Sequence, residues 1–310
     1  MLPLWVILGL GGVLFSVFGT MFDKYLLERY FNSKDQGGPG ALIIFSALFA
    51  VTVVLLVVAL RYSAIDFSLT VGAVGISAGV INGLWILMYL HAMIRADVSN
   101  VVPLFQTVPI FGLVFGAAIL GEYLTGPQVL AALVIMSGAI VLMCKIDSGR
   151  LGLDVTSMVL MLGSSSCVAL SQVVFKSAAV DANYWTAAFW LGVGYMSFGA
   201  SLYRFVPTYR RQFLTLFSKR RLQIIGVNAL NEVFDTAGDL IILAAVVIGP
   251  VALVQSLNAY EPMFIFLLSL LLMHLWPSYF QEDISTSALI QKFSGITIIV
   301  FGSIFLYSAI

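Results

Sequence analysis

Long apolar runs dominate this sequence and restrict what it can fold into. Runs such as Val51–Leu60 are apolar on every side, and the mostly apolar stretches 41–60 and 128–145 are roughly 20 residues long, the length that an α-helix needs to cross a hydrocarbon core of about 30 Å. Of the 310 residues, 61% are hydrophobic and 10% are charged, whereas soluble domains are nearer half apolar and a quarter charged. The sequence therefore predicts an all-α integral membrane protein.

Apolar runs of this kind follow one another along the chain, with Gly, Pro and polar residues between them. We expect ten transmembrane helices, at residues 3–22, 41–60, 70–93, 98–120, 128–145, 153–178, 185–205, 222–247, 250–275 and 288–309. The first run has no basic residue before it and is longer than the apolar region of a secretory signal. We therefore expect it to be retained as the first helix.

Basic residues gather on one side of the expected spans. Loops that follow odd-numbered spans hold nearly all of the 15 Lys and Arg residues, whereas the loops after even-numbered spans hold Arg61 alone. Since basic loops stay in the cytoplasm, this bias predicts that both termini face outward. Residues 204–221 are expected to lie beside anionic lipid, and we expect a multi-pass protein of a bacterial inner membrane.

The two halves of the chain resemble each other around a proline-containing span. The sequence from Ser99 reads SNVVPLFQTVPIF and the sequence from Ala252 reads ALVQSLNAYEPMF, which aligns Pro109 with Pro262. Five spans in each half is an odd number, so two such repeats must lie inverted in the membrane. This is the architecture of many secondary transporters, whose site lies at the midplane between the halves. We expect one repeat at residues 1–147 and the other at residues 148–310.

A short motif follows the fourth span. Residues 101–142 read VVPLFQTVPIFGLVFGAAILGEYLTGPQVLAALVIMSGAIVL, in which a proline-containing span precedes Leu120-Gly121-Glu122, a polar turn, Gln128 and Gly138. This stretch resembles an EamA-type member of the drug/metabolite transporter superfamily. The resemblance implies a ten-helix carrier of small metabolites, such as amino acids, amines, nucleosides or nucleotide-linked sugars.

The sequence departs from that family in two ways. The second repeat has Met273-His274 where the first has Gly121-Glu122. Members of the family also commonly keep both termini in the cytoplasm, whereas the distribution of Lys and Arg predicts the reverse here. We give the charge distribution more weight.

The eighth span carries an acidic stripe. Asn228, Glu232, Asp235 and Asp239 recur at steps of four, three and four residues, so they share one helix face. A charged group at the bilayer centre costs about 2.5–3.5 kcal/mol even on the most permissive scale. These acids must therefore face a polar cavity, be protonated or be paired.

Lys176, deep in the sixth span, is the expected partner if the stripe is a paired packing network. One lysine cannot neutralise three acids together with Glu261 of the ninth span, so we expect the acids to bind protons or a cationic substrate. For Lys176 itself we rank pairing with the acids of the eighth span first and contact with a substrate carboxylate second. Glu122, at a loop edge, is expected to be solvated.

Polar side chains on other spans complete the expected binding site for substrate or ion. They are Gln172 on the sixth span, Gln255 and Asn258 on the ninth, Gln106 on the fourth, and Asn82, Trp85 and Tyr89 on the third. Hydrogen bonds between packed helices are an equally good interpretation of the neutral residues in this group.

We expect a secondary active transporter that moves a small polar metabolite, cationic or zwitterionic, such as an amino acid or amine, by alternating access with proton coupling. The net charge of zero argues against a nucleic-acid partner, and the sequence has no nucleophile triad, phosphate loop or metal-ligand spacing. We therefore expect no enzyme activity, no cofactor and no metal. A monomer is expected because ten helices can enclose a path, although a dimer stays open.

Two alternatives remain. One is an exchanger or flippase of nucleotide-linked or lipid-linked sugars, which needs more deep cations than Lys176. The other is a structural or sensory membrane subunit without transport, in which all of the acids are paired.

Overall fold

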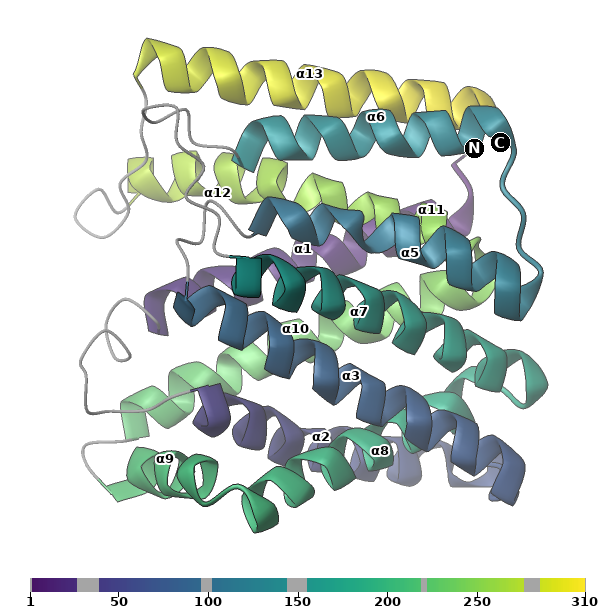
Figure 1. Ribbon diagram of the computed structural model, residues 1–310, viewed down its shortest axis with the longest axis vertical. Helices are drawn as coiled ribbons and strands as arrows, with labels where there is room; N and C mark the ends of the chain where they lie inside the picture. The colour runs from purple at the N-terminus through teal and green to yellow at the C-terminus, as the bar shows by residue number, and fades with distance from the viewer. Residues whose placement is uncertain are drawn as a thin grey trace.

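The computed structural model describes residues 2–26, 39–95, 102–143, 155–218, 222–275 and 285–309, and these residues are helices and the turns between them. The long helices lie side by side in one bundle (Figure 1). They are α1 (Leu4–Leu26), α2 (Pro39–Arg61), α3 (Leu69–Arg95), α5 (Val108–Phe115), α6 (Gly126–Met143), α7 (Val155–Asp181), α8 (Tyr184–Phe205), α9 (Pro207–Ser218), α10 (Leu222–Ile248), α11 (Val251–Ser256), α12 (Glu261–Leu275) and α13 (Thr286–Ala309).

Both ends of the described chain lie at one end of the bundle, on the right in Figure 1. We call this the termini end. It also holds the turns at residues 62–68, 121–125, 182–183 and 249–250, whereas α9 lies at the opposite end.

Within the described residues, seven helical stretches are long and apolar enough to cross a membrane. They are Leu4–Phe22, Gly40–Ala64, Leu69–Arg95, Pro103–Leu120, Val155–Asp181, Val251–Leu271 and Thr286–Ala309. The prediction of an all-helical membrane protein is thereby confirmed. The expected spans at 128–145, 185–205 and 222–247 coincide with α6, α8 and α10, and their passage through the membrane stays a prediction.

Two of the apolar stretches are broken helices. Residues 102–120 form a 3₁₀ turn (η3, Val102–Thr107), then α5, then a π-helical turn (η4, Gly116–Leu120). In the second stretch, α11 continues through another 3₁₀ turn (η5, Leu257–Tyr260) into α12, whose second residue is Pro262. Proline has no N–H to donate, so the breaks before α5 and before α12 fall where Pro109 and Pro262 weaken the α-helical hydrogen-bond ladder.

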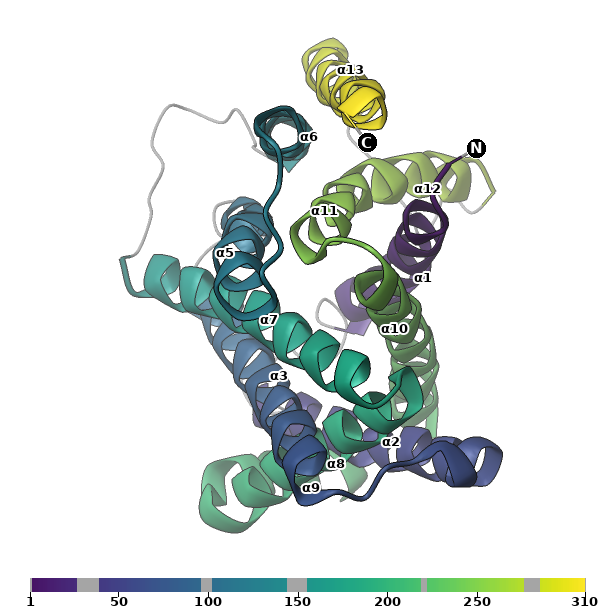
Figure 2. The same ribbon diagram turned by 90° about the vertical axis from the view of Figure 1, so that its right-hand side faces the viewer.

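The bundle has two walls when viewed along the helices from the termini end (Figure 2). One wall contains α3, α5 and α7, and the other contains α1, α10, α11 and α12. The helices α2, α8 and α9 lie across the bottom of this view, and α6 pairs with α13 at the top. The most extensive packing joins α1 to α10 and α3 to α7, so each wall is a unit in itself.

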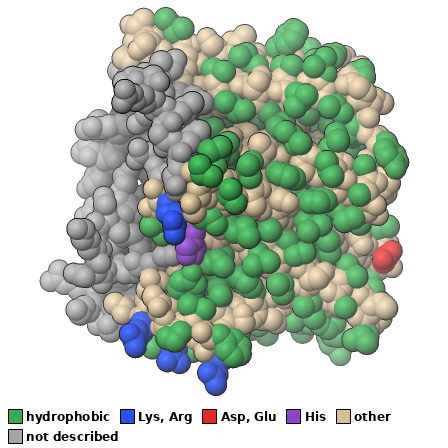
Figure 3. Space-filling view, in the orientation of Figure 1, with side chains coloured by type: hydrophobic (Ala, Val, Ile, Leu, Met, Phe, Trp, Pro, Cys, Tyr) green, Lys and Arg blue, Asp and Glu red, His purple; other side chains and the backbone are tan. Residues whose placement is uncertain are grey.

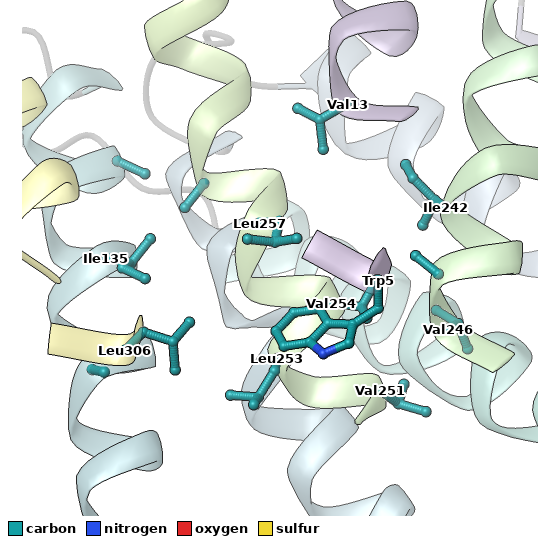
Figure 4. Packing of buried hydrophobic residues seen from close by; sticks show 14 of the residues in the cluster. Trp5, Val13, Ile135, Ile242, Val246, Val251, Leu253, Val254, Leu257 and Leu306 are labelled. Carbon is teal, nitrogen blue, oxygen red and sulfur yellow. The ribbon is translucent and has the colours of Figure 1, made fainter. Parts of the chain in front are cut away.

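A buried apolar cluster joins the α1–α10 wall to the α6–α13 pair near the termini end. Trp5 of α1 is 8% exposed and lies among Ile242 and Val246 of α10 and the first turns of α11 (Figure 4). Ile135 of α6 and Leu306 of α13 belong to the same cluster. Burial of large side chains of this kind fixes the helices relative to one another through close packing.

α1 and α10 approach so closely that their contact requires glycine. A Cβ added at Gly12 would lie 2.8 Å from the backbone oxygen of Gly238 and 2.6 Å from Cγ1 of Ile242. Small residues allow such approaches between membrane helices, where van der Waals packing drives association. The wall that carries the acidic stripe is therefore built on direct contact between two backbones.

α9 is tethered to the bundle at the opposite end. The hydroxyl of Tyr209 hydrogen-bonds Nε2 of His91 at 3.0 Å, and the Tyr209 ring packs against Gly40 at the start of α2. The side chains of Arg204, Arg210 and Arg211 around this helix are exposed. Figure 3 shows Lys and Arg side chains at this end of the molecule.

The two neighbouring glycines of α1 provide a direct test of this packing. We expect Gly12→Ala to destabilise the fold by about 1–3 kcal/mol, because the added methyl group overpacks the contact with α10. Gly11→Ala is the matched control, since no atom lies within 4 Å of a Cβ at that position. Thermal unfolding in detergent measures both variants, and equal melting temperatures would contradict the assigned contact.

Candidate functional site

The acidic stripe of α10 faces the inside of the bundle. Gly238 and Ile242 of the same helix contact α1, while Leu243 packs with Ala187 and Ala188 of α8. On a helix of 3.6 residues per turn, Glu232, Asp235 and Asp239 fall between these two directions. The shared face expected from the sequence thus points to the space between α1 and α8.

Two of the acids are held by neighbouring helices. Ser46 of α2 donates a short hydrogen bond to Oε1 of Glu232. Asp235 lies against α1, since a Cβ at Gly19 would lie 1.6 Å from its Oδ1. The carboxylate of Asp235 therefore rests on the bare backbone of α1, and only glycine leaves room for it.

Asp239 and Glu261 form the centre of the acidic group. Glu261, the first residue of α12, accepts a hydrogen bond of 2.7 Å from the hydroxyl of Thr20 on α1. The carboxyl of Asp239 lies within electrostatic range of Glu261. Asp239 is exposed even though its helix position faces the bundle interior, and it makes no hydrogen bond to another described residue. Its side chain is therefore not covered by packing against other described residues.

Two tyrosines of α8 adjoin this centre. Tyr184 and Tyr195 both lie within electrostatic range of Asp239, and Tyr195 also lies near Glu232 and Ser46. The Tyr195 side chain is 8% exposed, whereas Tyr184 directs its hydroxyl to the backbone oxygen of Leu240 at 2.8 Å. The rings supply polarisable surface beside the acids, which suits a cation with apolar parts.

The expected pairing of Lys176 with the acids of α10 is wrong. Its Nζ lies 2.5 Å from Oε1 of Glu122 and donates to the backbone oxygen of Gly249 at 2.7 Å. The expectation that Glu122 is solvated is also wrong, because its other carboxylate oxygen accepts a hydrogen bond of 2.8 Å from the N–H of Val251. Lys176 sits near the end of α7 at the termini end, so its side chain meets turns there and not the stripe.

Gln172 and Gln255 form a second polar contact, one helical turn from Lys176 along α7. Nε2 of Gln255 on α11 donates to Oε1 of Gln172 on α7 at 3.0 Å, and Gln255 is 1% exposed. The side-chain oxygen of Gln255 lies against Gly112 of α5, where a Cβ would be 1.8 Å away. Both residues therefore follow the second interpretation given by their sequence, a hydrogen bond between packed helices.

The third helix contributes an aromatic group. Nε1 of Trp85 donates to the side-chain oxygen of Asn82 at 2.9 Å, and the rings of Trp85 and Tyr89 are 5.9 Å apart. Both rings also pack against Phe105 of η3, at 5.8 and 5.6 Å between centroids. These three residues form a separate cluster against α7, where Val168 and Ala169 adjoin it.

The remaining candidates differ in burial. Asn228 is 2% exposed and Gln106 is 6% exposed, so each is fixed inside the bundle. Asn258 of η5 is half-buried, three residues before Glu261. Asn258 thus lies on the broken helix that also supplies the acidic centre.

Sequence reasoning did not identify Ser46, Thr20, Tyr195 or Glu122 as members of the site. Ser46, Thr20 and Tyr195 are single polar residues in apolar runs, and their positions relative to α10 depend on how the helices pack. Glu122 does have a local signal, because it follows Gly121, whose φ of 68° is a left-handed conformation that favours glycine. An acid held directly after such a turn is fixed in direction.

The arrangement is suited to binding a cation or exchanging a proton. Four carboxylates converge from α10 and α12, with hydroxyl donors on three of the neighbouring helices. Within the described residues, no group of three or more His, Cys, Asp and Glu side chains has the spacing to hold a metal ion.

Comparisons with known proteins give a family match and a shared fold. Residues 3–144 match the family described as the EamA-like transporter family. A solved structure described as a crystal structure of a protein superposes with a TM-score of 0.68 over 97% of this chain and 94% of its own, at 15% identity, which shows a shared fold. No curated protein matches the sequence.

The bond between Thr20 and Glu261 can be tested by an isosteric change. We expect Thr20→Val to lower stability by about 1–3 kcal/mol, because the carboxyl of Glu261 loses its hydrogen-bond donor inside the bundle. The matched control is Thr52→Val, since that hydroxyl donates to the backbone of its own helix on an exposed face, at 2.6 Å from Phe49 O. A thermal melt that shifts equally for both variants would argue against the bond.

Proposed function

We propose that this chain, whose residues 3–144 form an EamA-like transporter family domain, is a proton-coupled carrier of small organic amines or other cationic or zwitterionic metabolites. Members of a transporter family move small molecules and are not enzymes. The remaining question is which class of small molecule the interior of the bundle binds. The acidic centre around Asp239 and Glu261 supplies the argument.

The exposure of Asp239 carries the proposal. A carboxylate that faces the interior, is exposed and has no hydrogen bond within the described part of the chain is ready to accept an ammonium group. Charge-assisted hydrogen bonds between ammonium and carboxylate are among the strong ones in proteins. Glu261, within electrostatic range, adds a second negative group to the same place.

The same geometry favours a cation over an anion. Lys176, which an anionic sugar conjugate would need, is already engaged by Glu122 and by the backbone oxygen of Gly249. The exchange of nucleotide-linked or lipid-linked sugars is therefore a weaker interpretation. A purely structural role is weaker too, because it requires Asp239 to be paired.

Proton coupling follows from competition for the carboxylates. Carboxyl groups in a low-dielectric interior are stabilised by binding either a proton or a cationic ligand, since the bare charges are expensive there. An amine that binds at Asp239 and Glu261 displaces protons, and the carrier returns with protons in its place. This exchange links the amine gradient to the proton gradient.

For the whole molecule we propose ten transmembrane passes arranged as two inverted repeats, residues 1–147 and 148–310. The exposed Arg204, Arg210 and Arg211 lie at the opposite end of the bundle, which supports a cytoplasmic position for that end beside anionic lipid. The termini end then faces outward. We propose that one chain encloses the transport path, acting as a monomer.

The first test is transport by purified protein in liposomes that contain a trapped pH dye. We expect a proton flux when a panel of amines and amino acids is added, and a loss of roughly 10- to 100-fold in Asp239→Asn, because one charge-assisted bond to the ammonium disappears. Neutral analogues that lack the amine should give no flux.

Asp181→Asn is the matched control, since Asp181 is an exposed acid at the end of α7, outside the site. It should transport like the unmodified protein. Absence of flux with every compound, in protein whose melting curve shows an intact fold, would refute the proposal. Flux driven by sugar conjugates, and unaffected by Asp239→Asn, would favour the exchanger instead.

A further inference from the structure

Three parts of the chain converge on Lys176 at the termini end. They are α7, which carries the lysine, the turn between η4 and α6, which carries Glu122, and the turn between α10 and α11, which carries Gly249 and Val251. α7 belongs to one wall of the bundle, and the turn that carries Glu122 leads from that wall to α6. The turn that carries Gly249 and Val251 belongs to the opposite wall (Figure 2). The contact therefore joins the two walls.

Every strong bond of this contact crosses between elements. Lys176 Nζ binds Glu122 at 2.5 Å and the Gly249 oxygen at 2.7 Å, while Glu122 accepts from the Val251 N–H at 2.8 Å. The side chains of Lys176 and Glu122 are 11% and 21% exposed. Lys176, Glu122, Gly249 and Val251 thus form a compact bonded unit, which we call the latch.

A second layer of contact lies one helical turn deeper. Gln172 precedes Lys176 by four residues, so it projects from the same face of α7. It binds Gln255 of α11, which in turn presses against Gly112 of α5. The helices α5, α7 and α11 are therefore in direct contact with one another at this depth as well as at the latch. Gly112 leaves no room there for a side chain.

The broken helices separate beyond this layer. η3, which precedes α5, packs against α6 and α7, whereas α12, which follows α11, packs against α1 and α6. The two proline-containing stretches thus meet directly at the termini end, whereas toward the opposite end they share only α6, with η3 also packing against α7 and α12 against α1. Asp239 stands ten residues before Gly249 in the chain, nearly three helical turns from the latch toward the opposite end.

We propose that the latch is the gate of the termini end, and that this structure is the state in which the acidic site is shut off from that end; alternating access then implies entry from the opposite end. Desolvation of two charges largely offsets their attraction, so a buried ion pair adds little net stability. An ion pair of low net stability is suited to be broken and re-formed in each transport cycle, because the two charges are hydrated again when they separate.

The gate is one-sided in the sequence. The second repeat has Met273-His274 where the first has Gly121-Glu122, so the inverted copy lacks the acid that would make an equivalent ion pair at the opposite end. Closure of the opposite end must therefore use other contacts. This asymmetry assigns the ion pair to one access state only.

The gate rests on the transport cycle proposed above. Thiol labelling tests it without a substrate, so failure of the gate can be told apart from failure of the proposed transport. Asn258→Cys, in a background with Cys144→Ser and Cys167→Ser, reports whether the interior is reached by a membrane-impermeant maleimide. Ser63→Cys, at an exposed turn of the termini end, fixes the orientation of the vesicles. We expect the interior reporter to react from the opposite end and to be protected from the termini end.

Breaking the ion pair should reverse this protection. Lys176→Met is expected to raise labelling from the termini end by about tenfold or more, because the closed state then holds the carboxylate of Glu122 without its partner charge. The exchanged pair Lys176→Glu with Glu122→Lys should restore protection, which a merely misfolded protein would not do. Arg61→Met, at the same end but stacked on Trp185, is the matched control and should leave labelling unchanged.

Two results would overturn the proposal. One is equal labelling of the interior reporter from both ends in the background protein, which would mean that the termini end is not shut. The other is unchanged protection in Lys176→Met, provided its melting temperature stays close to that of the background protein.

Discussion

The cost of an uncompensated charge inside hydrocarbon governs this structure. Water is not at hand to solvate a carboxylate or an ammonium group there, so each must find its partner in the protein or face a space that a ligand or water fills. Glu122 and Lys176 meet this constraint with each other, whereas Glu232 and Glu261 meet it with hydroxyl groups of α2 and α1. Asp239 has no hydrogen bond to its carboxylate within the part of the chain that the structure describes.

The positions of the helices could be predicted from the sequence because the signal is local. A run of about 20 apolar residues needs no knowledge of its neighbours to be identified as a helix in a membrane. The acidic stripe was equally accessible, since steps of four and three residues place side chains on one face whatever the surroundings. The division of residues 102–120 and 251–275 into several helical pieces was only partly accessible, through their prolines.

The partners of the charged residues could not be predicted in the same way. Lys176 and Glu122 lie far apart in the chain, and neither sequence neighbourhood indicates the other. The most economical assumption, that the buried lysine pairs with the acids of α10, failed because Lys176 stands near the end of its helix and reaches the turns there. The roles of Thr20 and Ser46 could not be predicted either, because the hydrogen-bond partner of a hydroxyl in an apolar run depends on which helix packs against it.

The carboxylate of Glu122 uses its two oxygens on two different helices. One oxygen binds the ammonium group of α7, and the other binds the first N–H of α11. A displacement of α7 that pulls Lys176 away also disturbs the carboxylate that holds α11, and the reverse is equally true. The positions of the two helices at this end of the bundle are therefore coupled through a single carboxylate.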